Sequence, residues 1–306
     1  MQKQFIIILS FILLLTSIAN ANNKEKNTKF EILRSADKTI NQTIEQISES
    51  RKVFDKYLNG SLYSQEAVNE INKIQKKIIN IQNQTKMSGN NKDMILYIYK
   101  IKSSTNKLQN SLEKMKTFIK KDYADNEKRM KDFLISQTND TYSFMDTILK
   151  AEKDFLYNAE IKNTDNKDDE DNEDINQNIE DYIKMRKNLV DIKIKQQEIS
   201  KDMELTILNA TFNSDKEQII KKMSDILKRA ENIKLSLQQM PKIESMNVLR
   251  ESTIESWDIS IKILEEMTKS ISGKENKNFE NIIKEYKEKI ESLKNKTEEF
   301  SENIDK

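Results

Sequence analysis

Residues Asn91 to Ala159 read NKDMILYIYKIKSSTNKLQNSLEKMKTFIKKDYADNEKRMKDFLISQTNDTYSFMDTILKAEKDFLYNA, and this stretch decides the fold of the chain. It contains neither glycine nor proline, and its apolar residues recur at alternating steps of four and three. This spacing places them along one face of a helix, while lysine and glutamate occupy the other faces. The apolar face consists of Met94, Ile98, Ile101, Leu108, Leu112, Met115 and Ile119.

An unbroken helix over this stretch would be on the order of 100 Å long, because each residue adds about 1.5 Å. An amphipathic helix of that length needs partner helices along its apolar face. The apolar register shifts after Tyr123, and we expect a kink or break at the polar patch from Ser136 to Thr141. The stretch therefore predicts an elongated helical bundle that contains a long central helix.

The composition of the whole chain favours the same fold. Its 306 residues include only three glycines and one proline, although the tight turns of sheets usually require these residues. Charged residues make up 34% of the chain and hydrophobic residues 36%, which is typical of long amphipathic helices. We predict an all-α fold, an elongated bundle of about seven helices with coiled-coil-like packing.

Apolar stripes with helical spacing also flank the central stretch. Asp37 and Arg51 interrupt the first stripe, and Gly60 is expected to end that helix because glycine readily adopts the left-handed conformation. Ser214 and Glu217 have the spacing of a capping box, and the stripe that follows is the most regular in the chain, so we expect Ile226 and Ile233 in the core. The flanking helices are predicted near residues 28–58, 64–88, 175–212, 214–240, 242–271 and 274–306.

The helical pattern is lost over residues 163–174, which we interpret as a solvated acidic loop. The segment from Asp165 to Asp174 contains seven acidic residues and one lysine. It lacks the glycine that a calcium-binding EF-hand loop requires at its sixth position. The loop divides the chain into an N-terminal helical half, residues 22–162, and a C-terminal helical half, residues 175–306.

The N-terminus has the pattern of a secretory signal peptide. Lys3 precedes an apolar core from Phe5 to Ile18, and Ala19 and Ala21 form an A-x-A cleavage site. The apolar core is short for a membrane-spanning helix, which needs about 20 residues. We therefore expect cleavage after Ala21, a mature chain that begins at Asn22, and a secreted or periplasmic location.

The residue types in the chain exclude several kinds of catalysis. Without cysteine and histidine, neither Ser-His nor Cys-His catalysis, nor ordinary zinc sites, can be built. Ser-x-x-Lys spacings begin at Ser35, Ser104 and Ser111, no more often than the lysine content predicts by chance. Three glycines cannot supply a phosphate-binding loop. We expect a protein that is not an enzyme and that has no cofactor and no metal.

The charged and aromatic residues of the chain indicate which kinds of partner it can bind. Removing Lys3 with the signal leaves 51 basic and 51 acidic side chains, and only six residues are arginine, so we do not expect nucleic-acid binding. Trp257, the only tryptophan, lies in a helical stripe, where core packing is favoured over an exposed interaction anchor.

These features predict an exported helical bundle that acts through protein–protein interaction, as an adhesin, surface component or scaffold. The identity of the partner stays open, as does self-association through the helices. The alternative is an α-helical pore-forming toxin. Its nearest candidate for an inserting segment, Met94 to Tyr99, is six residues long and too short to span a bilayer, so membrane insertion is not expected.

Overall fold

The computed structural model describes residues 28–84, 92–124, 126–158, 173–212, 215–273 and 279–303. The predicted signal peptide with its cleavage site at Ala19, Ala21 and Asn22 lies outside the described residues, as does the acidic segment from 163 to 172.

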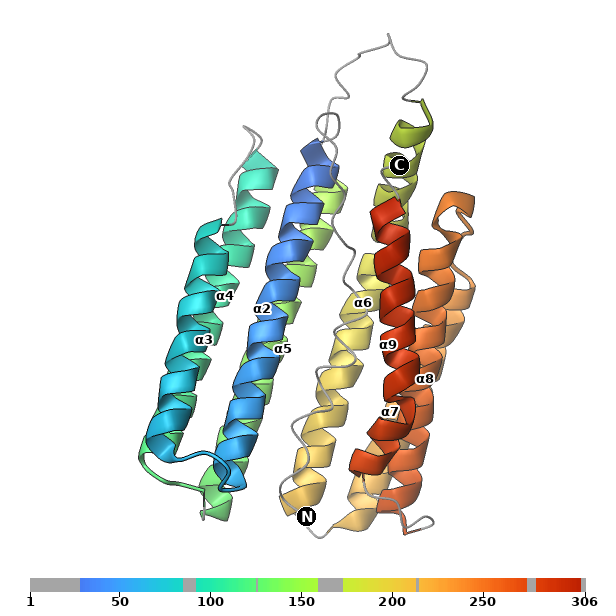
Figure 1. Ribbon diagram of the computed structural model, residues 1–306. Helices are drawn as coiled ribbons and strands as arrows, with labels where there is room; N and C mark the ends of the chain where they lie inside the picture. The colour runs from blue at the N-terminus through green and yellow to red at the C-terminus, as the bar shows by residue number, and fades with distance from the viewer. Residues whose placement is uncertain are drawn as a thin grey trace.

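Over the described residues the chain is helical and contains no strand, which confirms the predicted all-α bundle (Figure 1). Eight α-helices occur there, together with one short 3₁₀-helix, against about seven predicted. Their bounds are α2 Thr28–Leu58, α3 Ser64–Gln84, α4 Lys92–Lys120, α5 Glu127–Asn158, α6 Glu173–Phe212, α7 Lys216–Gln238, η3 Glu244–Met246, α8 Asn247–Ile271 and α9 Phe279–Asn303.

The predicted long central helix is two helices, α4 and α5, which pack against each other. The chain turns where the apolar register shifts, and Asp122 adopts the left-handed conformation with φ of 50°. Asp122 N–H donates to the Ile119 carbonyl at 3.1 Å and Tyr123 N–H to the Phe118 carbonyl at 3.5 Å, the pattern of a Schellman C-cap. Asn126 then accepts from Arg129 N–H at 3.0 Å and starts α5.

The prediction of a break at the polar patch from Ser136 to Thr141 was wrong, because this patch lies inside α5. Its side chains find partners on neighbouring helices instead of interrupting the backbone. Gln137 accepts from the Ser111 hydroxyl of α4 at 2.6 Å, and Thr138 donates to Glu204 of α6 at 2.9 Å. The patch is polar because it bonds adjacent helices to α5.

The other helix ends follow local sequence signals. Gly60 and Gly273 both have φ of 75° and follow the C-termini of α2 and α8, as expected for Gly60. Ser214, where a capping box was expected, lies outside the described residues, and the N-cap of α7 is Asp215, whose carboxylate accepts from Gln218 N–H at 3.1 Å. Helix α7 therefore begins slightly later than predicted, at Lys216.

The apolar faces of the helices form two cores. The larger core contains residues of α2, of the N-terminal part of α4 and the C-terminal part of α5, and of α6, α7, α8 and α9. The smaller one lies between α2, α3, α4 and α5 near their connecting turns and includes Phe54, Phe118 and Phe133. Ile226 and Ile233 of α7 are 3% and 4% exposed, so the prediction that they are buried is confirmed.

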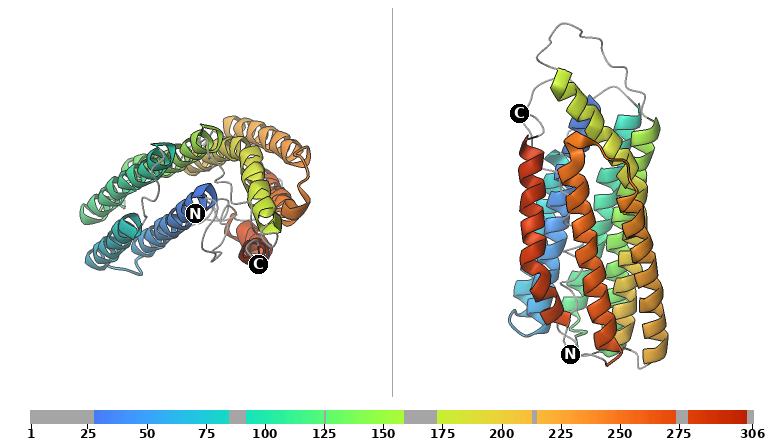
Figure 2. Two further views of the ribbon diagram at one scale, coloured as in Figure 1. Left: turned by 90° about the horizontal axis from the view of Figure 1, so that it is seen from above. Right: turned by 90° about the vertical axis from the view of Figure 1, so that its right-hand side faces the viewer.

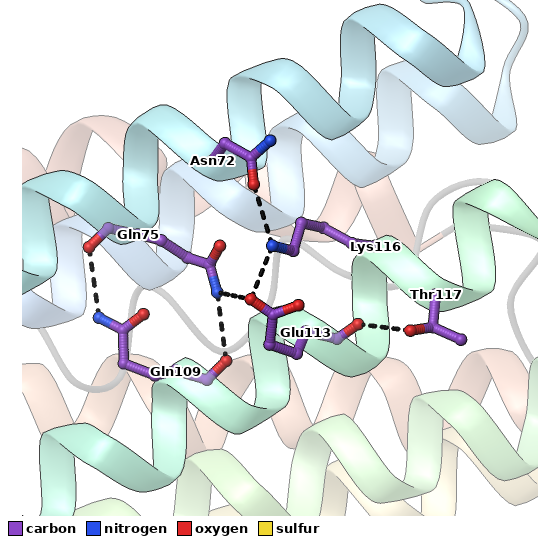
Figure 3. A network of polar contacts seen from close by, with 6 residues as sticks. All are labelled: Asn72, Gln75, Gln109, Glu113, Lys116 and Thr117. Carbon is purple, nitrogen blue, oxygen red and sulfur yellow. Dashed lines mark hydrogen bonds and ion pairs between the residues drawn. The ribbon is translucent and has the colours of Figure 1, made fainter.

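The helices run side by side along one long axis (Figure 1), and seen from above they form an arc (Figure 2). The closest helix pairs follow chain order from α2 to α9, so each helix packs mainly against its sequence neighbours. Polar contacts support one of these pairs. Gln75 of α3 donates to Glu113 of α4 at 2.9 Å, and Lys116 donates to Asn72 at 2.9 Å (Figure 3).

Candidate functional site

A buried ionic cluster lies where α2, α5 and α6 meet. Arg186 of α6 is 2% exposed, and its guanidinium binds both carboxylate oxygens of Asp37 on α2, with Nη2 donating to Oδ1 at 3.0 Å. Its Nε donates to Glu152 of α5 at 2.8 Å. Three helices are thus joined by one arginine, and removing it would leave two buried carboxylates without their partner.

Two further side chains of α6 complete this cluster. Tyr182 is one turn before Arg186, and its hydroxyl accepts from Nη1 of Arg186 at 2.7 Å. Lys193 is half-buried and close enough to Asp37, Glu152 and Arg186 for their charges to affect it. Burial lowers the pKa of Lys193 and raises the pKa of Asp37, although the Arg186 guanidinium opposes the shift at Asp37.

A pocket of about 80 Å³ adjoins the cluster. Residues of α2, α5, α6 and α8 line it, and α2 and α8 are not closely packed against each other. Its lining combines the four ionic side chains with polar and apolar ones. These are Asp37, Ile40, Asn41, Met145, Ile148, Leu149, Glu152, Arg186, Leu189, Lys193, Gln196, Gln197, Ser200, Leu249, Thr253, Ser256, Trp257 and Ser260.

Two lining residues of α6 present hydrogen-bonding groups that are not satisfied by the described part of the chain. Gln197 is 7% exposed; its Nε2 donates to the Tyr142 carbonyl at 2.8 Å, but its Oε1 accepts no hydrogen bond there. Lys193, one turn earlier, lines the same pocket and forms no ion pair within 4.0 Å with a described residue. The Gln197 Oε1 atom has no accessible surface, so it does not face the open space of the pocket, whereas Lys193 is half-buried and water can hydrate its ammonium group.

The hydroxyl groups of the pocket are occupied within their own helix. Thr253 donates to the Leu249 carbonyl at 2.8 Å, Ser256 to the Thr253 carbonyl and Ser260 to the Ser256 carbonyl, both at 3.0 Å. Arg186 is likewise occupied by Asp37 and Glu152. The hydroxyl and guanidinium donors that line the pocket are therefore engaged within the bundle.

A second, smaller pocket of about 30 Å³ lies further along α2, α4, α5 and α6. Arg51 of α2 donates to the Thr141 hydroxyl at 3.3 Å and lies 3.9 Å from Glu204 of α6. Burial raises the pKa of Glu204, although Arg51 opposes this shift. Asp37 and Arg51 are the two residues that interrupt the first apolar stripe, and both form buried polar contacts with α5 or α6.

The residues singled out in the sequence are placed as follows. Trp257 is 3% exposed and its indole N–H donates to the Ala230 carbonyl at 2.8 Å, so it lies in the core and forms one wall of the larger pocket. In the Ser-x-x-Lys pairs, the Ser104 and Ser111 hydroxyls donate to Ile101 and Gln137 rather than to a lysine. Among the described residues, acidic side chains form no group of three that could hold a metal ion.

The surface carries a short apolar row at the start of α4. Within the six-residue apolar run, Tyr97 and Ile98 are buried, whereas Ile95, Leu96 and Tyr99 are 40%, 43% and 62% exposed. Residues three and four positions apart are neighbours on a helix, so these three side chains form one continuous patch. None of the described helices combines the length and the apolar character that crossing a membrane requires.

In comparisons with known proteins, no family model, curated protein or solved structure matches this chain.

Proposed function

We propose that this protein acts through protein–protein contact as an exported helical bundle, without catalysis. The observation that supports this proposal most directly is the apolar row of α4, formed by Ile95, Leu96 and Tyr99, which remains exposed while Tyr97 and Ile98 of the same run are buried. Contiguous exposed apolar side chains are a common mark of interaction sites, and tyrosine is frequent among residues that contribute most binding energy.

We expect the partner to present an apolar surface of its own, because the three side chains of the row carry no charge. The nearest charged side chain with a defined contact, Lys100, pairs with Asp154 of α5 at 3.2 Å. Such a contact gains its free energy from burying the three side chains together with the surface that faces them.

A pull-down with matched variants tests this proposal. The row variant carries Ile95→Gln, Leu96→Gln and Tyr99→Gln, which remove apolar area but keep good helix formers. Its control carries Ile79→Gln, Leu235→Gln and Val248→Gln, three exposed apolar residues on three other helices. We expect one protein from cell-envelope or host extracts to bind the wild type and the control but not the row variant. Equal capture by both variants would reject the row as the contact site.

Leakage assays address the pore-forming alternative. Under the proposal, the mature protein releases no dye from liposomes and does not lyse red cells at concentrations that saturate its partner. If the wild type causes leakage and the row variant does not, Ile95, Leu96 and Tyr99 contact the membrane rather than a protein.

A further inference from the structure

We infer that the first turns of α4 bind an acidic amphipathic helix of a partner protein. The inference rests on the proposed function, because it uses the same apolar row, Ile95, Leu96 and Tyr99, and it adds the charge that the partner must carry. Three observations support it: the lysines that extend the row, the lack of acidic residues on the same face of α4, and the position at which α3 ends.

Two lysines extend the apolar row at its ends. Lys92 is three positions before Ile95, and Lys102 is three positions after Tyr99. Residues with this spacing share one face of a helix, so a basic residue stands at each end of the row. Lys92 is exposed and Lys102 half-buried, and neither forms an ion pair with a described residue. We call Lys92, Ile95, Leu96, Tyr99 and Lys102 the α4 stripe.

The positive charge of the α4 stripe is not balanced on its own face. Asp93 is the only acidic residue of α4 before Glu113. It is seven positions before Lys100 and therefore shares the face of Lys100, which pairs with Asp154, and not the face of the stripe. Lys92 is also the first residue of α4, where the helix dipole adds partial positive charge. Anionic groups are therefore favoured beside the stripe.

Helix α3 ends before it reaches the stripe. Gln82 of α3 donates to Asn106 of α4 at 2.9 Å, and the two helices run antiparallel. In this register Tyr99, seven positions before Asn106, would face a residue seven positions after Gln82. Helix α3 ends earlier, at Gln84, and α4 continues past it (Figure 1). A partner helix can therefore pack on α4 where α3 no longer covers it.

The dimensions and charge of the stripe define the partner segment. Lys92 and Lys102 are about 15 Å apart along the axis of α4, or roughly three turns. The matching helix presents carboxylates at a similar separation and apolar side chains between them. A symmetric contact between the stripes of two copies is disfavoured, because both are basic. An anionic membrane is also disfavoured, because helices that lie on lipid use a larger apolar face than three side chains.

Two fluorescent synthetic peptides provide the test. The acidic peptide has about 18 residues, enough for partial helix formation, with leucine at steps of three and four and glutamate at both ends of the leucine face. The basic peptide has lysine in place of each glutamate. Fluorescence anisotropy measures their binding to the mature protein. We expect the acidic peptide to bind about tenfold more tightly, which corresponds to about 1.4 kcal/mol and is within reach of two exposed ion pairs.

Charge reversal assigns this preference to the two lysines. Lys92→Glu with Lys102→Glu should weaken binding of the acidic peptide about tenfold and make the basic peptide the tighter ligand. The matched control is Lys221→Glu with Lys222→Glu, two exposed positions of α7, which changes the net charge equally and should leave the preference unchanged. Circular dichroism verifies that each variant is folded. If the charge-reversed protein is not, Lys92→Gln with Lys102→Gln replaces it and should abolish the preference.

The row variant distinguishes failure of the inference from failure of the proposed function. If both peptides bind the wild type equally and neither binds the row variant, the row is a protein contact but the partner is not acidic, and the inference is overturned. No binding of the acidic peptide, or equal loss in the two charge-reversed proteins, also overturns it, while the pull-down still decides the proposed function. Vesicles that contain phosphatidylserine test the other anionic surface. Binding to them that requires Lys92 and Lys102, without peptide binding, would replace the partner helix by a membrane.

Discussion

Arg186→Met is expected to destabilise the bundle strongly, because it removes the cation shared by α2, α5 and α6. Asp37 and Glu152 are 5% and 3% exposed, so water cannot replace the lost contacts. Removing one partner of a buried ion pair typically costs about 3–5 kcal/mol, and here two carboxylates lose their partner. We expect the free energy of unfolding, measured in urea at neutral pH, to fall by an amount near the upper end of this range.

The stability that Arg186→Met loses relative to the wild type should become smaller as the pH falls. Burial already raises the pKa of Asp37 in the wild type, and Arg186 is the main group that opposes this shift. Without Arg186 the folded-state pKa of Asp37 rises further above its unfolded value, so folding takes up a proton and stability increases on acidification. Unfolding of Arg186→Met at a series of pH values from 7 to 5 measures this change.

Arg229→Met is the matched control for this substitution. Arg229 of α7 pairs with Asp202, but their side chains are 43% and 48% exposed, and such surface pairs contribute about 0–1 kcal/mol. Replacing Arg186, Asp37 and Glu152 together by apolar residues should recover much of the stability lost in Arg186→Met. The reasoning is refuted if Arg186→Met unfolds within about 1 kcal/mol of the wild type, as expected of the control.

Four further predictions concern other parts of the chain. Ile233→Ala should cost about 2–5 kcal/mol in thermal or urea unfolding, whereas Lys228→Ala, on the exposed face of α7, should stay within about 0.5 kcal/mol; equal effects would contradict the assignment of the core. Burial raises the pKa of Asp55 from 3.8 to about 7, although Arg51 opposes the shift, so stability should fall as pH rises between these values and Asp55→Asn should flatten that slope. N-terminal sequencing of exported protein should begin at Asn22, and a chain that keeps Met1 would contradict signal cleavage. Limited proteolysis should cut first between Asp165 and Asn172, and first cuts within α4 would exclude this loop as the most accessible site.

Much of the fold could be predicted from local pattern, because helix faces depend on residues three and four positions apart. The stripe of α7 identified its buried face, with Ile226 and Ile233 in the core. The turn between α4 and α5 was misplaced since Asp122, not glycine, adopts the left-handed conformation there. Only the register shift after Tyr123 marks this position in the sequence, and the side chains of the polar patch form hydrogen bonds with other helices instead of ending α5.

The candidate site was only partly visible in the sequence. Asp37 and Arg51 stood out as charges inside an apolar stripe, which was the available signal for buried polar contacts. Their partners could not be inferred, because Arg186 lies 149 residues after Asp37 and helical periodicity carries no information at that separation. Gln197 and Lys193 belong to a polar run of α6, and only the packing of α2 and α8 around α6 makes them pocket residues.

Site-specific photo-crosslinking tests the central claim, that the apolar row of α4 is a protein contact. A photoreactive phenylalanine analogue replaces Tyr99 in one protein and Leu235 of α7 in another, both exposed positions, at 62% and 53%. Each protein is irradiated in the cells that export it and in the extracts used for capture. The account predicts one discrete cross-linked protein from position 99 and none from position 235. The same species from both positions, or none from position 99, would contradict it.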